Sequence, residues 1–128
     1  MTPHEWLEAY SEAWRTADVH GVGELFTEDA TYHETPYDEP FRGREGIREY
    51  WARVTAVQSD VVVRYGTPIS DGNRTAVEWW VTMLSSGEPV TLAGEFLLVF
   101  DEAGRCSALR EYWHFAPGTQ EPQTGWGY

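Results

Sequence analysis

The sequence predicts a single domain of the α+β class, in which three N-terminal helices pack on a strongly bent antiparallel sheet. Two observations lead to this prediction. Up to Ala56, two segments repeat apolar residues at spacings of three and four, which is the period of a helix, and a shorter segment between them begins with a helix cap. After Ala56, four runs rich in β-branched and aromatic residues are separated by turn signals. The length of 128 residues suits one domain around one core.

The first helix is predicted from Pro3 to about Ala17. Thr2 is a suitable N-cap, proline is favoured at the first helical position, and Glu5 can complete a capping box. The apolar face of this helix comprises Trp6, Tyr10, Ala13, Trp14 and Ala17. A second, shorter helix is predicted from a cap at Asp18 through Phe26, and its two glycines imply that tertiary packing must stabilise it.

An irregular connection separates the second helix from the third. Thr31 to Glu34 is rich in strand formers and predicts a short strand, whereas Pro36 and Pro40 prevent regular structure after it. The third helix is predicted from Gly43 to about Ala56, because apolar residues recur there at helical spacing. These residues are Ile47, Tyr50, Trp51 and Val54.

Four strands in hairpin order are predicted for the rest of the domain. They span Asp60–Ile69, Arg74–Leu84, Val90–Phe100 and Arg105–Phe115. The turns between them are marked by Asp71-Gly72, Ser86-Gly87-Glu88-Pro89 and Glu102-Ala103-Gly104. We therefore divide the chain into a domain of residues 1–116 and a C-terminal tail of residues 117–128. The tail is rich in Gly and Pro but ends in two aromatic residues, so we expect it to dock on the domain.

Charge and composition exclude several classes of function. The net charge is −12, with nine basic residues that are all Arg, so we expect neither a nucleic-acid partner nor an anionic membrane. No apolar run approaches the roughly 20 residues of a membrane span. The N-terminus lacks a secretory signal pattern, so we expect a cytoplasmic protein. Cys106 is the only cysteine and no His and Glu share a metal-ligand spacing, so no disulfide, metal or cofactor is expected.

The order of these elements, together with four motifs, resembles the nuclear transport factor 2-like superfamily, and within it the SnoaL-like polyketide cyclase and ketosteroid isomerase branch. The motifs are LFTEDATYHE, FRGREGIREYW, SGEP and VFDEAGRCSALREYW, and the likeness covers about Trp6 to His114. The resemblance implies a cone-shaped α+β barrel around an apolar cavity. Because the superfamily holds isomerases, cyclases, dehydratases, epoxide hydrolases and non-enzymatic domains, the fold alone does not decide the function.

The resemblance also implies a set of polar site residues. In ketosteroid isomerases a carboxylate on the first strand moves the proton, while a phenol on the first helix and an acid on a late strand hold the developing enolate. The carboxylate falls on Glu34 and the phenol on Tyr10. The late-strand acid falls on Phe96, which cannot donate a hydrogen bond, and this counts against ketosteroid isomerase activity itself. Glu111 is the remaining polar residue expected to face the cavity.

Strand alternation and the resemblance together predict the apolar lining of the cavity. The expected ligand-binding residues are Trp14, Phe26, Tyr32, Tyr50, Trp51, Trp79, Val81, Met83, Leu92, Phe96, Leu98, Leu109 and Trp113. The same alternation sends Trp80 and Tyr112 to the outer face of the sheet. An exposed aromatic sheet face usually marks an interface, so we expect a homodimer that pairs through this face.

The leading hypothesis is a cofactor-independent enzyme that performs isomerisation, cyclisation or dehydration on an aromatic or polycyclic small molecule. Two carboxyl groups in one apolar cavity titrate at different pH values, so one can act as an acid and the other as a base. Glu34 would be the base, Tyr10 would stabilise the oxyanion, and Glu111 would assist. Several alternatives remain open: Glu34 pointing to solvent, Glu111 paired with an arginine, indoles filling the cone, and a binding or interaction module without chemistry.

Overall fold

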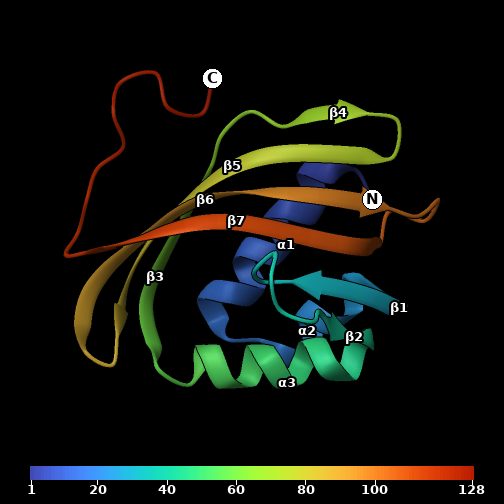
Figure 1. The fold of residues 1–128 in the computed structure, drawn as a ribbon, viewed down its shortest axis with the longest axis horizontal. Coiled ribbons are helices and arrows are strands. Elements are labelled where there is room, and N and C mark those ends of the chain that lie inside the picture. Colours follow the sequence, from blue (N-terminus) through green and yellow to red (C-terminus); the bar gives the residue numbers. More distant parts are fainter.

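The structure is a computed structural model that describes all residues, Met1–Tyr128, and it confirms the α+β class (Figure 1). The helices are α1 (Pro3–Thr16), α2 (Val19–Glu24) and α3 (Gly43–Thr55). The strands are β1 (Phe26–His33), β2 (Phe41–Arg42), β3 (Gln58–Tyr65), β4 (Ile69–Asp71), β5 (Arg74–Ser85), β6 (Glu88–Phe100) and β7 (Cys106–Pro117). None of the helices is both long enough and apolar enough to cross a membrane.

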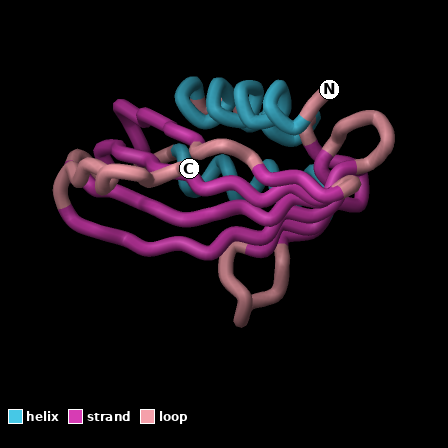
Figure 2. Tube along the Cα trace, turned by 90° about the horizontal axis from the view of Figure 1, so that it is seen from above, coloured by secondary structure: helices cyan, strands magenta, loops and turns pink.

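The sheet is strongly curved and does not close into a complete barrel. Its strand order is β2-β1-β7-β6-β5-β3, with the short β4 paired to β5. The long strands β3, β5, β6 and β7 pair antiparallel as predicted, but β1 runs parallel to β7, so the sheet is mixed. Parallel neighbours need a long crossover connection, and here most of the chain lies between the two strands. Figure 2 shows the curvature of the strands and a helix lying across one side of them.

The second helix and the first strand differ from their predicted bounds. The helix ends at Glu24 and not at Phe26, and the strand starts at Phe26 and ends at His33, just before Glu34. Phe26 pairs with Cys106 of β7, and the indole N–H of Trp6 donates to the Leu25 carbonyl oxygen at 2.8 Å. These contacts with distant residues end the helix early. The predicted capping box of α1 is confirmed, with Thr2 and Glu5 bonded reciprocally.

The first long strand of the hairpin region is also divided. The predicted run Asp60–Ile69 becomes β3, which begins at Gln58, and the separate β4. The pairing of β3 with β5 shifts between Ser59 and Val62, around a residue with positive φ. Between β3 and β4 the Thr67 amide donates to the Gly127 carbonyl oxygen of the tail at 2.8 Å, so it is not available to a neighbouring strand.

The backbones of β6 and β7 approach each other closely at Gly94. A Cβ added to Gly94 would overlap the Tyr112 carbonyl oxygen and would lie 2.8 Å from Trp113 Cα. Only glycine permits such a close approach of two backbones. Gly94 pairs with Trp79 on one side and with Trp113 on the other, so this close approach lies between two inward-facing indoles.

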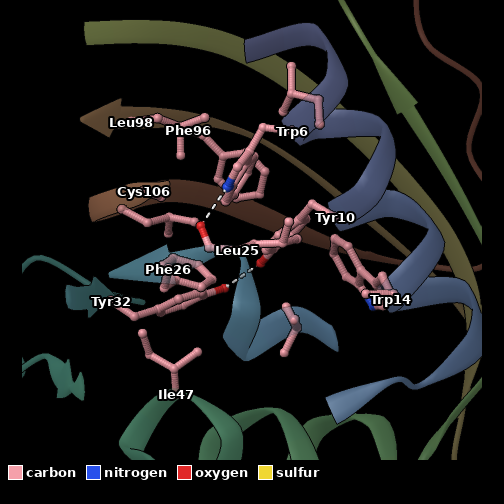
Figure 3. Close-up of a cluster of buried hydrophobic side chains, with 14 of the residues drawn as sticks. Trp6, Tyr10, Trp14, Leu25, Phe26, Tyr32, Ile47, Phe96, Leu98 and Cys106 are labelled. Atoms are coloured by element: carbon pink, nitrogen blue, oxygen red, sulfur yellow. Dashed lines mark hydrogen bonds between the residues drawn. The ribbon is translucent and has the colours of Figure 1, made fainter. Parts of the chain in front are cut away.

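Aromatic side chains fill one end of the curved sheet (Figure 3). Trp6 stacks on Tyr10 with ring centroids 4.9 Å apart and meets Phe26 and Phe100 edge-on at 5.7 Å. Tyr10 in turn meets Phe96 at 5.5 Å. This end of the predicted cone therefore holds a packed core and no ligand space.

The C-terminal tail docks on the outer face of the sheet. It leaves β7, turns back and ends beside the connection between β3 and β4 (Figure 1). The indole N–H of Trp80 donates to the Gln120 carbonyl oxygen at 3.0 Å, and its ring meets that of Trp126 edge-on at 5.8 Å. The Thr91 hydroxyl donates to the Gly118 carbonyl oxygen at 2.8 Å. The tail thus covers Trp80, which the sequence analysis had assigned to an exposed face.

Candidate active site

An inner cavity of about 180 Å³ lies next to the packed core, between the helices and the concave face of the sheet. Three polar residues take part in its lining: Glu34, Gln58 and Glu111. The other lining residues are Trp14, Tyr32, Tyr50, Trp51, Val54, Trp79, Leu92 and Trp113. Four larger hollows lie elsewhere. Three of them, of about 450, 550 and 390 Å³, lie outside against the C-terminal tail and contain neither Glu34 nor Glu111. The fourth, of about 260 Å³, borders Glu111 from the side of His33 and Arg110 but does not contain Glu34, whereas the inner cavity contains both carboxyl side chains. We therefore take the inner cavity as the candidate site.

The structure brings together about half of the predicted lining. The predicted residues that border the inner cavity are Trp14, Tyr32, Tyr50, Trp51, Trp79, Leu92 and Trp113. The other predicted residues lie in the buried core outside the cavity: Phe26, Val81, Met83, Phe96, Leu98 and Leu109. Strand alternation finds the inward face, but it does not tell which inward side chains pack against one another. Val54 and Gln58 border the cavity and were not among the predicted residues.

Glu111 is the deepest polar group of the cavity, with only 7% of its surface exposed. The Tyr32 hydroxyl donates to Glu111 Oε1 at 2.9 Å. The Tyr10 and Tyr32 hydroxyls lie 3.2 Å apart, and Figure 3 shows this second contact. No ion pair joins Glu111 to Arg110 or Arg64, since Arg64 pairs with Glu121 of the tail at 3.6 Å. Glu111 is thus held by phenols and carries no counter-charge.

Burial gives Glu111 an unusual protonation state. Loss of hydration raises its pKa from 4.5 to about 8; the nearby Glu34 adds to the rise, and the hydrogen bond from Tyr32 opposes it. The side chain therefore carries its proton at neutral pH. Burial also raises the pKa of Tyr10 and Tyr32 well above the usual phenol value, so both remain protonated.

Glu34 borders the cavity from the loop that follows β1. It is half-buried, and burial together with the neighbouring Asp38 raises its pKa, while Arg53 opposes the rise. Its carbonyl oxygen accepts a hydrogen bond from the Trp113 indole at 3.1 Å, which ties the loop to β7. Glu34 thus lies between solvent and the cavity, and is less buried than Glu111.

Tyr10 does not border the cavity, although the resemblance assigned it the oxyanion-stabilising role. It is completely buried and reaches Glu111 only through Tyr32. The hydroxyl that touches Glu111 belongs to Tyr32, which was expected only as a lining residue. Tyr32 precedes Glu34 by two residues, and this spacing on a strand was the signal that could have identified its inward hydroxyl.

The four indole N–H groups of the cavity lining either donate hydrogen bonds to the protein or are buried from solvent. The Trp14 indole donates to Gln58 Oε1 at 2.8 Å, and the Trp113 indole is bonded to Glu34. The indole nitrogens of Trp51 and Trp79 are buried from solvent without a hydrogen-bond partner. No group of three or more His, Cys, Asp or Glu side chains is placed to hold a metal ion.

Comparison with known proteins identifies relatives of the same fold. The family model described as "SnoaL-like domain" matches residues 7–109. The structure is similar to SalBIII, an epoxide hydrolase/cyclase-like enzyme with a role in pyran ring formation in the polyether salinomycin, with a TM-score of 0.76 and 22% identity over 87% of this chain and 89% of that chain. It is also similar to a protein from Catenulispora acidiphila with a ketosteroid isomerase-like fold, solved in complex with trimethylamine, with a TM-score of 0.76 and 24% identity over 88% of this chain and 86% of that chain. No curated protein matches the chain.

Proposed function

The chain belongs to the SnoaL-like domain family of the nuclear transport factor 2-like superfamily, and we propose that its inner cavity is the active site of a cofactor-independent acid/base enzyme. The reaction would be an isomerisation, cyclisation or dehydration of an apolar small molecule. One observation carries this proposal: two carboxyl groups border one apolar cavity, and the more deeply buried of them holds its proton at neutral pH. Such a pair supplies an acid and a base at the same pH.

The two carboxyl groups have different tasks in this mechanism. Glu34, as a carboxylate, takes a proton from a carbon next to the carbonyl group of the substrate. The protonated Glu111 donates a hydrogen bond to the oxygen on which negative charge develops, and Glu34 then returns the proton to a different carbon in an isomerisation. Tyr32 holds Glu111 in place, and Tyr10 acts on Glu111 through Tyr32.

The volume of the inner cavity limits the substrate. A protein cavity of about 150 Å³ accommodates benzene, whereas pockets for drug-sized ligands measure about 300–1,000 Å³. The inner cavity, at about 180 Å³, is close to the lower figure. We therefore propose a substrate whose enclosed part is a single ring, in place of the polycyclic molecule that the sequence had also allowed.

Isomerisation of 3-cyclohexen-1-one to the conjugated 2-cyclohexen-1-one, followed by ultraviolet absorbance, tests the catalytic proposal with a single-ring probe. We expect the protein to accelerate it, and Glu34→Gln to lower kcat about 100-fold or more, the usual contribution of a general base. The rate should also fall above about pH 8, where Glu111 loses its proton. The exposed Glu39→Gln, on the same loop as Glu34, should keep full activity. No acceleration by the protein, or full activity in Glu34→Gln, would reject the proposal.

A second candidate is a small-molecule-binding module without chemistry. The C. acidiphila relative solved with trimethylamine supports this candidate, because a protein of the same fold was captured with a compact molecule. Binding of a small molecule in the inner cavity, measured together with no turnover of the cyclohexenone probe, would favour it over the enzyme.

We also propose that the chain forms a homodimer through the outer face of the sheet. Tyr112 is 46% exposed there, which leaves an aromatic side chain uncovered beside the docked tail. The tail already covers Trp80, so the interface would be centred on β7.

A further inference from the structure

The inner cavity is bordered by acidic side chains and by no basic ones. Glu34 and Glu111 are both acidic, and no Arg, Lys or His takes part in the lining. Arg53, which influences Glu34, has its guanidinium group over the ring of Phe41, at 5.6 Å from the centroid. Two carboxylates in one low-dielectric cavity disfavour each other's ionised form. The cavity therefore lacks the positive charge that would stabilise both.

The walls of the inner cavity suit a cation as well. Six of its eleven lining residues are aromatic, and the four indoles among them are Trp14, Trp51, Trp79 and Trp113. The faces of aromatic rings attract organic cations, and indole does so most strongly. The indole N–H groups, which would serve an anion or another acceptor, are bonded to the protein or shielded from solvent.

Glu111 offers a specific contact point inside these walls. It is more than nine-tenths buried, and only its Oε1 takes part in a hydrogen bond with the protein. Its Oε2 has no hydrogen bond with the protein and is not completely buried, so it can be reached from the cavity. A ligand N–H or a positive charge in the cavity would contact this oxygen.

We propose that the inner cavity selects a compact organic cation, a protonated amine no larger than one ring with a short side chain, in preference to neutral or anionic molecules of the same size. Glu34 would provide negative charge, Glu111 would add to it by releasing its proton when the cation binds, and the indoles would provide the surrounding π-faces. This inference concerns the same cavity as the proposed enzyme but does not depend on catalysis. A neutral ligand of the same size is the competing outcome.

Isothermal titration calorimetry with three matched probes tests this inference. Benzylammonium, benzyl alcohol and benzoate share one ring and differ in charge. At pH 8 and low salt we expect benzylammonium to bind at least tenfold more tightly than benzyl alcohol, and benzoate to show no binding. Equal or tighter binding of benzyl alcohol, measurable binding of benzoate, or no binding of benzylammonium would overturn the inference.

Two variants separate a local effect from the general negative field of the protein. Glu34→Gln should lower the affinity for benzylammonium about tenfold and bring it close to that for benzyl alcohol. Glu95→Gln removes the same charge from the exposed outer face of the sheet and should change neither affinity. An equal loss in both variants would mean that net charge alone attracts the amine, and would overturn the inference.

Proton release reports on Glu111 directly. A bound cation favours the carboxylate, so benzylammonium binding at pH 7 should release protons from Glu111, whereas benzyl alcohol binding should not. The titratable groups around Glu111 in the inner cavity and core are Tyr10 on α1, Tyr32 on β1, Tyr50 on α3 and Glu34; burial raises the pKa of all three phenols, so they do not titrate there. On its other side, His33 and Arg110 border a separate hollow with Glu111, and burial together with Arg110 lowers the pKa of His33. Phosphate and Tris take up released protons with different enthalpies, so the measured heat of binding should differ between the two buffers. Equal heats would contradict the contact with Glu111.

The two proposals on the inner cavity can fail separately. The cyclohexenone probe is neutral, so its turnover does not depend on a preference for cations. If the protein turns over the probe but shows no preference for cations, the catalytic proposal stands and the cation site is rejected. Preference for benzylammonium without turnover of the probe would reject the catalytic proposal alone.

Discussion

At the scale of single residues, Glu111 shows how neighbours change a side chain's chemistry. Its position on the inward face follows from strand alternation, and the sequence predicted it. Its protonation does not follow from the sequence, because it depends on burial and on a phenol that lies 79 positions earlier in the chain. The same limit applies to Tyr10: the helical period shows that it faces inward, but only the packing shows that it lies behind Tyr32.

The raised pKa of Glu111 predicts that part of the protein's stability is lost as pH rises. The pKa is about 8 in the folded chain and close to 4.5 once hydration is restored, so the folded state holds an extra proton between these values. The free energy of unfolding therefore falls through this range, by at most about 1.4 kcal/mol per pH unit. Urea unfolding at pH 5, 7 and 9 should show a shallower fall for Glu111→Gln than for the wild type. Parallel pH profiles would contradict this prediction.

At the scale of elements, β1 shows where local sequence patterns no longer predict the bounds of a strand. The long antiparallel strands β5, β6 and β7 were predicted within a few residues, because turn residues separate strongly apolar runs. The start of β1 was misplaced by five residues, from Thr31 to Phe26, because its parallel partner β7 lies far along the chain. Gln58 was missed for a related reason, since β3 begins before the valine-rich run that predicted it.

The close approach of β6 and β7 predicts that Gly94 is intolerant of substitution. Gly94→Ala should lower the free energy of unfolding by about 1–3 kcal/mol, the usual cost of overpacking, because the new Cβ meets the backbone of β7. Gly46→Ala in α3 is the matched control, since its Cβ would have its nearest contact at an ordinary 3.7 Å. That change should stabilise the protein by up to about 1 kcal/mol, because alanine favours helices. Urea unfolding measures both, and a neutral Gly94→Ala would show that the sheet can relax there.

At the scale of the whole molecule, the two faces of the sheet have separate tasks. The concave face, together with the helices, encloses the inner cavity, whereas the outer face carries the docked tail and the exposed Tyr112 of β7. The sequence predicted this division through alternation, and it predicted docking of the tail from its terminal aromatics. It did not predict that the tail covers Trp80, because the route of a Gly- and Pro-rich segment leaves no periodic signal.

The exposed Tyr112 on the outer face of β7 predicts the oligomeric state of the chain in solution. We expect a dimer in light scattering coupled to size-exclusion chromatography, and a monomer for Tyr112→Glu, because a charge in the centre of an apolar interface is costly to bury. Tyr37→Glu is the control, since this equally aromatic side chain is 96% exposed on a loop away from the sheet. A monomeric wild type, or a dimer that survives Tyr112→Glu, would contradict the proposed interface.

The row Trp79, Gly94 and Trp113 also matters for protein engineering. These residues lie side by side on three strands, so a position without a side chain separates two indoles. The central position cannot change without a clash with the backbone of β7, and Trp79 is almost wholly buried. Trp113, by contrast, is 36% exposed at the edge of the cavity. Under the proposed function, position 113 is therefore the end of the row at which a smaller residue would admit larger rings while the packed core stays intact.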